Sequence, residues 1–149
     1  MNITAAFLYT TTAAWHGVNA FFFCARSNAF IKTYSLTDER SDTLASDVVS
    51  WQGGLHAALS AFSFISAFRV FTLPKLDMQV PLLLGAVSLS QSILVRPYDR
   101  WRPELSWFTI INGGLAFSHL LLALFAYRAS SSNMVLGVLN SVQKMINST

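Results

Sequence analysis

Three histidines interrupt long apolar runs of this chain. His16, His56 and His119 each lie in a different run. An imidazole can act as a general acid or base and can bind a metal ion, so a histidine within apolar sequence is a candidate for chemistry. The structural alternative is that each ring hydrogen-bonds to a neighbouring helix and stabilises the packing of the two helices.

Amide side chains accompany the histidines. Gln52 precedes His56 by four residues, which places both on one face of a helix. At about 1.5 Å of rise per residue, His56 lies about 10 Å from one end of its run, and Asn19, Gln91 and Asn112 lie at similar depths in the other runs. We therefore expect Asn19, Gln52, His56, Gln91 and Asn112 to form one polar layer, with Gln52 and His56 contacting Asn19 or Asn112.

Such a layer permits three interpretations. It can hold helices together through interhelical hydrogen bonds. It can also line a pocket that receives the hydroxyl or headgroup of a lipid. Finally, it can be the site of a small intramembrane enzyme, in which His16, His56 or His119 transfers a proton and Asn112 or Gln52 orients a sterol, terpenoid or other lipid.

Other kinds of chemistry lack the residues that they require. The three histidines fall one to a run, without the local histidine pair of a metallohydrolase, so no metal site is expected. The apolar runs contain no paired carboxylates, and no glycine-rich phosphate loop or cofactor motif is present. The net charge of +3 comes from scattered residues, which does not indicate a nucleic-acid partner. The single cysteine, Cys24, cannot form an intrachain disulfide.

The composition predicts that these polar residues are positioned by membrane helices. Hydrophobic residues make up 53 % of the 149 residues and charged residues only 11 %, against roughly 25 % charged in ordinary soluble domains. Four segments have about the length that crosses a bilayer, namely 3–25, 48–71, 78–95 and 105–127. We predict an all-α fold, a single membrane domain built as a four-transmembrane-helix bundle. The alternative for the first segment is a cleaved signal peptide, although no Lys or Arg precedes it.

The connections and the tail complete this prediction. The segment 26–47 is predicted to be a polar loop, 72–77 a tight turn, and 96–104 a short loop at the membrane interface. After the serines at 130–132, the tail 130–149 is predicted to form a short C-terminal amphipathic helix on the membrane surface or on a partner, with fraying as the alternative. Its apolar face would comprise Val135, Val138, Leu139, Val142, Met145 and Ile146. An even number of crossings places both termini on one side of the membrane.

Small residues recur at intervals of four within two of the predicted helices. Gly53, Ala57 and Ala61 form one such stripe, and Gly114 and Ser118 form another. Stripes of this kind let helix backbones approach closely in membranes. We expect them to pack within the bundle, or to form the contact between two copies of the chain.

The chain has Asn19 late in the first apolar segment, Tyr34 fifteen residues later, and Leu44-Ala45 leading to Trp51. In these residues the layout resembles one known family, the ergosterol biosynthetic protein 28 family. Of that family's Ala-Arg-Thr-Phe-Gly-x-Trp approach the chain keeps only Ala45 and Trp51, and its His-Phe-x-x-Glu motif is replaced by Ser-Leu-Ser-Gln-Ser-Ile-Leu. The resemblance implies a non-enzymatic scaffold of the endoplasmic reticulum that tethers enzymes of sterol biosynthesis.

The sequence therefore favours a non-catalytic membrane scaffold or complex subunit. Its expected partners are the lipid bilayer, other membrane proteins and a sterol or other lipid. The small intramembrane enzyme is the second hypothesis. An enzyme would have a pocket that opens to lipid and is lined by the histidines, whereas a scaffold would have a closed cluster of mutually bonded side chains.

Overall fold

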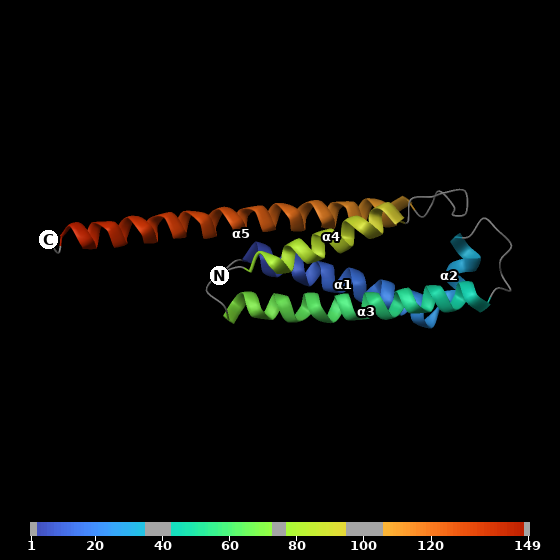
Figure 1. The fold of residues 1–149 in the computed structure, drawn as a ribbon. Coiled ribbons are helices and arrows are strands. Elements are labelled where there is room, and N and C mark those ends of the chain that lie inside the picture. Colours follow the sequence, from blue (N-terminus) through green and yellow to red (C-terminus); the bar gives the residue numbers. More distant parts are fainter. Residues whose placement is uncertain (1–2, 35–42, 73–76, 95–105, 148–149) are drawn as a thin grey trace.

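The computed structural model describes residues 3–34, 43–72, 77–94 and 106–147, and this part of the chain is almost entirely helical (Figure 1). Its five helices are α1 (Ile3–Ala25), α2 (Ser27–Tyr34), α3 (Thr43–Thr72), α4 (Gln79–Leu94) and α5 (Ser106–Ile146). The all-α prediction is confirmed for the described residues, which contain no strand.

The helices form two antiparallel hairpins that lie against one another. α3 runs back along α1, and α5 runs back along α4 (Figure 1). α1 also contacts α5, so the two hairpins share one interior. The short helix α2 lies at the end of the bundle where α1 finishes and α3 begins, while the N-terminus of α1 and the C-terminus of α5 lie toward the other end.

The inward-facing positions follow a heptad-like spacing. Steps of four and three residues alternate along each helix, as in helices that pack knobs-into-holes. We call these positions the seam. Its buried members are Ala5, Tyr9, Thr12, His16, Asn19 and Phe23 on α1; His56, Leu59, Ser63 and Ser66 on α3; Pro81, Leu84, Ser88 and Gln91 on α4; and Phe108, Asn112, Leu115, His119, Leu122 and Ala126 on α5.

Half of the seam positions are polar, whereas the outer surface carries many large apolar side chains. Among the described residues, ten polar side chains are buried, beside 15 aliphatic and aromatic ones. Large apolar side chains instead point outward, and Phe7, Trp51 and Phe117 are each at least 70 % exposed. A water-soluble domain buries such side chains, since their removal from water is the main favourable term in folding. The described part of the chain therefore combines a partly polar interior with an apolar exterior.

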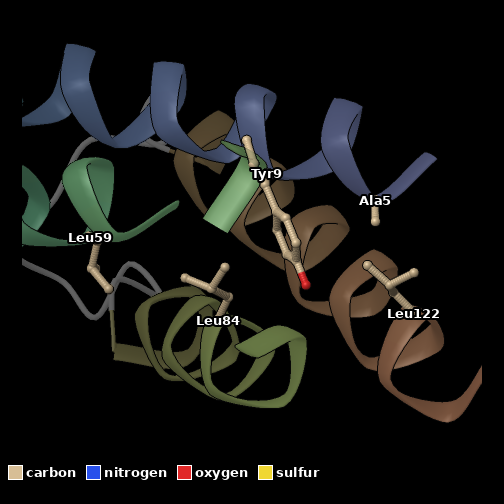
Figure 2. Packing of buried hydrophobic residues seen from close by; sticks show 6 residues of the cluster. Ala5, Tyr9, Leu59, Leu84 and Leu122 are labelled. Carbon is tan, nitrogen blue, oxygen red and sulfur yellow. The ribbon is translucent and has the colours of Figure 1, made fainter. Parts of the chain in front are cut away.

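Apolar packing is concentrated in two clusters at the ends of the seam. Figure 2 shows the first, in which the Tyr9 ring extends from α1 between α4 and α5 and lies near Leu84 and Leu122. The second cluster contains Phe23 and Phe108, with Trp15, Phe30, Tyr34 and Val49 packed around them. Along α1 and α5, the polar residues of the seam lie between the two clusters.

The structure changes several predicted boundaries. The first segment coincides with α1, but the predicted loop 26–47 is wrong in two places. Residues 27–34 form α2, because Phe30 packs on Phe23 and Ile31 is buried. The second helix begins at Thr43 rather than at residue 48. The predicted loop 96–104, and most of the loop 72–77, lie outside the described residues.

The predicted break at the tri-serine segment is also wrong. α5 continues from Ser106 to Ile146 without interruption, so the tail is an extension of the fourth predicted helix and not a separate one. Serine side chains fit within a helix when they donate to the carbonyl four residues earlier. Ser132 donates to the Arg128 carbonyl at 3.0 Å, and Ser141 to the Gly137 carbonyl at 2.9 Å. Most of the predicted apolar face of the tail lies outside the described side chains, although Leu139 is exposed.

Two helices of the described part are long and apolar enough to cross a membrane. They span 47–72 and 106–132. α4 is apolar but shorter, and α1 is long but carries more polar residues.

Candidate functional site

The centre of the seam holds a direct contact between two histidines. His16 of α1 and His56 of α3 approach with their Nδ1 atoms 2.8 Å apart, and both side chains are at most 1 % exposed. A neutral imidazole carries its proton on one of its two nitrogens. One ring must therefore donate from Nδ1 and the other accept at Nδ1, so the two histidines hold opposite tautomers.

Aromatic rings enclose this histidine pair. The Phe23 ring centroid lies 5.1 Å from that of His56, and the Phe108 centroid lies 6.1 Å from it, both edge to face. These contacts bring α1 and α5 onto the same side chain of α3. They also close the pair off from the surface, because neither histidine retains an exposed edge.

The third histidine belongs to a separate contact between α1 and α5. His119 Nε2 lies 2.8 Å from the hydroxyl of Thr12, which also donates to the Leu8 carbonyl at 2.8 Å. Since a hydroxyl has a single proton, the Thr12 oxygen accepts from His119, and the imidazole proton resides on Nε2. The Tyr9 ring stacks on His119 with centroids 5.7 Å apart.

Trp15, which lies beside the seam, and Asn112 make a further contact between α1 and α5. Trp15 Nε1 donates to Asn112 Oδ1 at 3.2 Å, which joins α1 to α5. The amide nitrogen of Asn112 donates to the Phe108 carbonyl, and that of Asn19 donates to the Trp15 carbonyl, each at 2.9 Å. Both amides thus use their donors within their own helix, and only Asn112 bridges to a neighbour through its side-chain oxygen.

The predicted polar layer is present only in part. Asn19, His56, Gln91 and Asn112 are buried, but they do not share one hydrogen-bond network. The predicted partner of His56 is wrong, because His56 contacts His16 rather than Asn19 or Asn112. Neither amide atom of Gln91 has a hydrogen-bond partner.

Gln52 contradicts the prediction that it faces inward, because its side chain is exposed. The cause is the contact of α3 with the end of α1. Gly53 is the residue that meets α1 here, and a Cβ atom added to it would lie 2.8 Å from the Cys24 backbone nitrogen. With Gly53 turned toward α1, the neighbouring side chains of Trp51 and Gln52 point outward.

Sequence reasoning missed Thr12 and Trp15, although both contribute side-chain hydrogen bonds between helices. Their spacing in the sequence indicated that both could face inward. Thr12 lies four residues before His16, and Trp15 lies four residues before Asn19, so each extends a face that already carried a predicted residue.

Several buried polar atoms of the seam have no hydrogen-bond partner. They include His16 Nε2, His119 Nδ1, the Tyr9 hydroxyl, and the hydroxyls of Ser63 and Ser88. Leaving such groups unpaired is costly away from water. The histidines do not gather into a metal site, and no group of three or more His, Cys, Asp or Glu suited to a metal exists within the described ranges.

The predicted small-residue stripes occupy different environments. Gly53 faces α1, as expected for close helix packing, whereas Gly54 and Gly114 have no atom near the position of a Cβ. Ala57 and Ala61 line an open groove of about 620 Å³ between α1 and α3. At its floor, the Ser60 hydroxyl donates to the Ala13 carbonyl at 2.8 Å and ties the two helices together.

No protein-family model matches the chain, and no curated protein or solved structure is significantly similar to it.

Proposed function

We propose that the chain is a multi-pass integral membrane protein in which α1, α3, α4 and α5 cross the bilayer as one bundle. The observation that carries this proposal is the distribution of side chains: histidine, asparagine and serine side chains are buried, while many phenylalanine, leucine and isoleucine side chains are exposed. Exposing apolar side chains to hydrocarbon carries no free-energy penalty. Helices in a membrane instead associate through close packing of small residues and through interhelical hydrogen bonds.

The distribution of charge supports the same proposal. α1 and α4 contain no Lys, Arg, Asp or Glu, and neither do residues 48–68 of α3 and 106–127 of α5. The uncharged stretches of α1, α3 and α5 are about 31–35 Å long at 1.5 Å per residue, close to the hydrocarbon thickness of about 30 Å. α4, with 16 residues in its helix, spans only about 24 Å and would require local thinning of the bilayer or further residues at its ends.

Within the membrane, the function that we propose is that of a non-catalytic scaffold or complex subunit. The histidines of a lipid-transforming enzyme must be reached by a substrate. Here all three are fully buried, and each contacts another side chain of the seam. This closed arrangement fits side chains that hold helices together. Following the resemblance to the ergosterol biosynthetic protein 28 family, the proposed partners are lipid-biosynthesis enzymes of the endoplasmic reticulum.

One observation favours the alternative of a small intramembrane enzyme. His16 Nε2, His119 Nδ1 and the Tyr9 hydroxyl are buried without hydrogen-bond partners, so each retains a free donor or acceptor. If the two hairpins separated to admit a lipid, these atoms could exchange protons with it.

Membrane insertion is tested by extraction of native membranes at high pH without detergent. The proposal expects the chain to stay in the membrane fraction and to require detergent for release. Release into the aqueous fraction as a folded monomer would contradict it.

The scaffold and the enzyme are separated by the variant His56→Leu in cells that depend on the protein. A scaffold retains function in proportion to the amount of folded protein. An acid–base enzyme loses about 10²–10⁴-fold in activity although the fold is intact. The matched control is Gln52→Leu, which changes an exposed polar residue one helical turn away.

A further inference from the structure

A pocket lies at the α2 end of the bundle, away from the histidines. Its volume is about 530 Å³, and its walls come from the last turns of α1, from α2 and from Trp107 in the first turn of α5. The aromatic cluster around Phe23 forms its inner boundary. This volume is within the usual range for small-molecule sites, which is roughly 300–1,000 Å³.

The lining combines one cation with aromatic walls. Arg26 is the charged side chain among the described lining residues, and no carboxylate accompanies it there. Phe22, Phe30 and Trp107 supply apolar surface, while Asn19 and Tyr34 supply polar groups. Asn19 is only 4 % exposed, so the pocket reaches a side chain of the packed interior of the bundle.

The position of the pocket defines the kind of molecule that can enter it. Arg26 directly follows the uncharged length of α1, so it stands where the apolar band of the exterior ends. Tyr34 and Trp107 are residue types that favour the boundary between hydrocarbon and headgroups. A ligand seated here meets a cation on its outer side and aromatic rings on its inner side, which matches an amphiphile with an anionic head.

We infer that this pocket binds an anionic phospholipid, with the phosphate at the Arg26 guanidinium and the glycerol and upper acyl carbons against Phe22, Phe30 and Trp107. A guanidinium presents parallel N–H donors that suit phosphate oxygens. The inference rests on the proposed membrane insertion, but it involves a different site from the histidines. The bound lipid would connect α1, α2 and α5 at the membrane boundary.

The test uses the full chain reconstituted in bilayer discs of phosphatidylcholine with one fifth phosphatidylglycerol, then released in mild detergent. Native mass spectrometry counts the retained lipids. The expected result is retention of phosphatidylglycerol above its share of the bilayer. Arg26→Gln should reduce that retention about fivefold. Ala29→Phe, which fills the pocket but keeps the cation, should reduce it as well.

Two matched variants distinguish binding of the lipid in this pocket from non-specific attraction of anionic lipids to any basic side chain. Lys32→Gln removes a cation on α2 that does not line the pocket, and Arg128→Gln removes one near the other end of the bundle. Both should retain phosphatidylglycerol like the original chain. Equal losses in the Arg26, Lys32 and Arg128 variants, or retention that merely follows bilayer composition, would overturn the inference. Soluble glycerophosphate should not displace the lipid, and displacement would instead assign the site to a free phosphate.

The proposed membrane insertion is checked on the same sample. A chain that inserts into the discs but retains no phosphatidylglycerol selectively contradicts the lipid site alone. A chain that fails to enter the discs and stays folded in buffer contradicts both proposals.

Discussion

At the scale of single residues, the molecule depends on a few hydrogen bonds that pass between helices. The hydrogen bond between His16 and His56 joins α1 to α3. Two further hydrogen bonds join α1 to α5, one between Thr12 and His119 and the other between Trp15 and Asn112. Three of these six side chains lie on α1, where Thr12 and His16 are seam positions one helical turn apart and Trp15 lies beside them. α1 is thus the helix through which the two hairpins are bonded to each other.

A double-mutant cycle at His16 and His56 measures the first of these links. We expect His16→Ala and His56→Ala to be less than additive, with a coupling of about 0.6–1.7 kcal/mol in the free energy of unfolding, as for interhelical hydrogen bonds in membranes. Unfolding in mixed detergent, followed by circular dichroism, gives the values. Gln52→Ala, an exposed change on the same helix, should couple to His16→Ala by less than about 0.5 kcal/mol. Additive histidine variants would show that the 2.8 Å contact is not a stabilising bond.

The adjacent glycines of α3 provide a second test. Gly53→Ala should lower the free energy of unfolding by about 1–3 kcal/mol, because its Cβ would press on the backbone of Phe23 and Cys24 at the end of α1. Gly54→Ala is the matched control, since a Cβ there meets no atom within 4 Å. It should raise helix stability by up to about 1 kcal/mol. Equal effects of the two substitutions would contradict the close approach of α1 to α3 at Gly53.

The shared depth of the polar residues predicted which side chains are buried better than it predicted their hydrogen-bond partners. Equal depth along four helices was enough to suggest that Asn19, His56, Gln91 and Asn112 face inward, because an unpaired polar group in hydrocarbon is costly. It could not give the rotation of each helix about its own axis. That rotation depends on which small residue a neighbour approaches, and at α3 this is Gly53, so Gln52 faces outward.

At the scale of elements, long apolar segments were the reliable signal and short ones were not. α1 was predicted with its observed bounds because nothing charged interrupts it. α2 was missed because it is only eight residues long and weakly hydrophobic, and it lies between charged and polar neighbours. Its helical state depends on tertiary contacts, chiefly the Phe23–Phe30 ring pair with centroids 4.8 Å apart.

The long helix α5 has two parts with different roles, which a truncation can separate. Ala126 is its last buried residue among those described, and the described side chains after it are exposed apart from the half-buried Ser131. Deleting residues 130–149 should therefore change the free energy of unfolding of the bundle by less than about 0.5 kcal/mol, while weakening association with a partner.

The control for this truncation is Leu122→Ala within the seam. It should cost about 2–4 kcal/mol, because Leu122 belongs to the buried cluster of Figure 2. If removal of the tail destabilised the bundle as much as this substitution, the tail would have to pack on the bundle.

At the scale of the whole molecule, four crossings predict that both termini lie on one side of the membrane. Cysteine labelling can test this, with the exposed Cys24 at the α2 end as an internal reference. In sealed vesicles, cysteines introduced at Asn2 and Ser148 in a Cys24→Ser chain should react with an impermeant reagent together. Native Cys24 should react only when the opposite side is exposed. Labelling of positions 2 and 148 from opposite sides would contradict four crossings.

The uninterrupted course of α5 has a mechanical consequence. From Ala126 to Ile146 the helix continues for 20 residues past its last described buried side chain, a length of about 30 Å. The preceding turns of α5 anchor this extension in the bundle. A partner that binds at its end is therefore held at a fixed distance and in a fixed direction relative to the bundle. The chain would then act as a strut, whose reach is changed by about 5.4 Å for each helical turn inserted or removed.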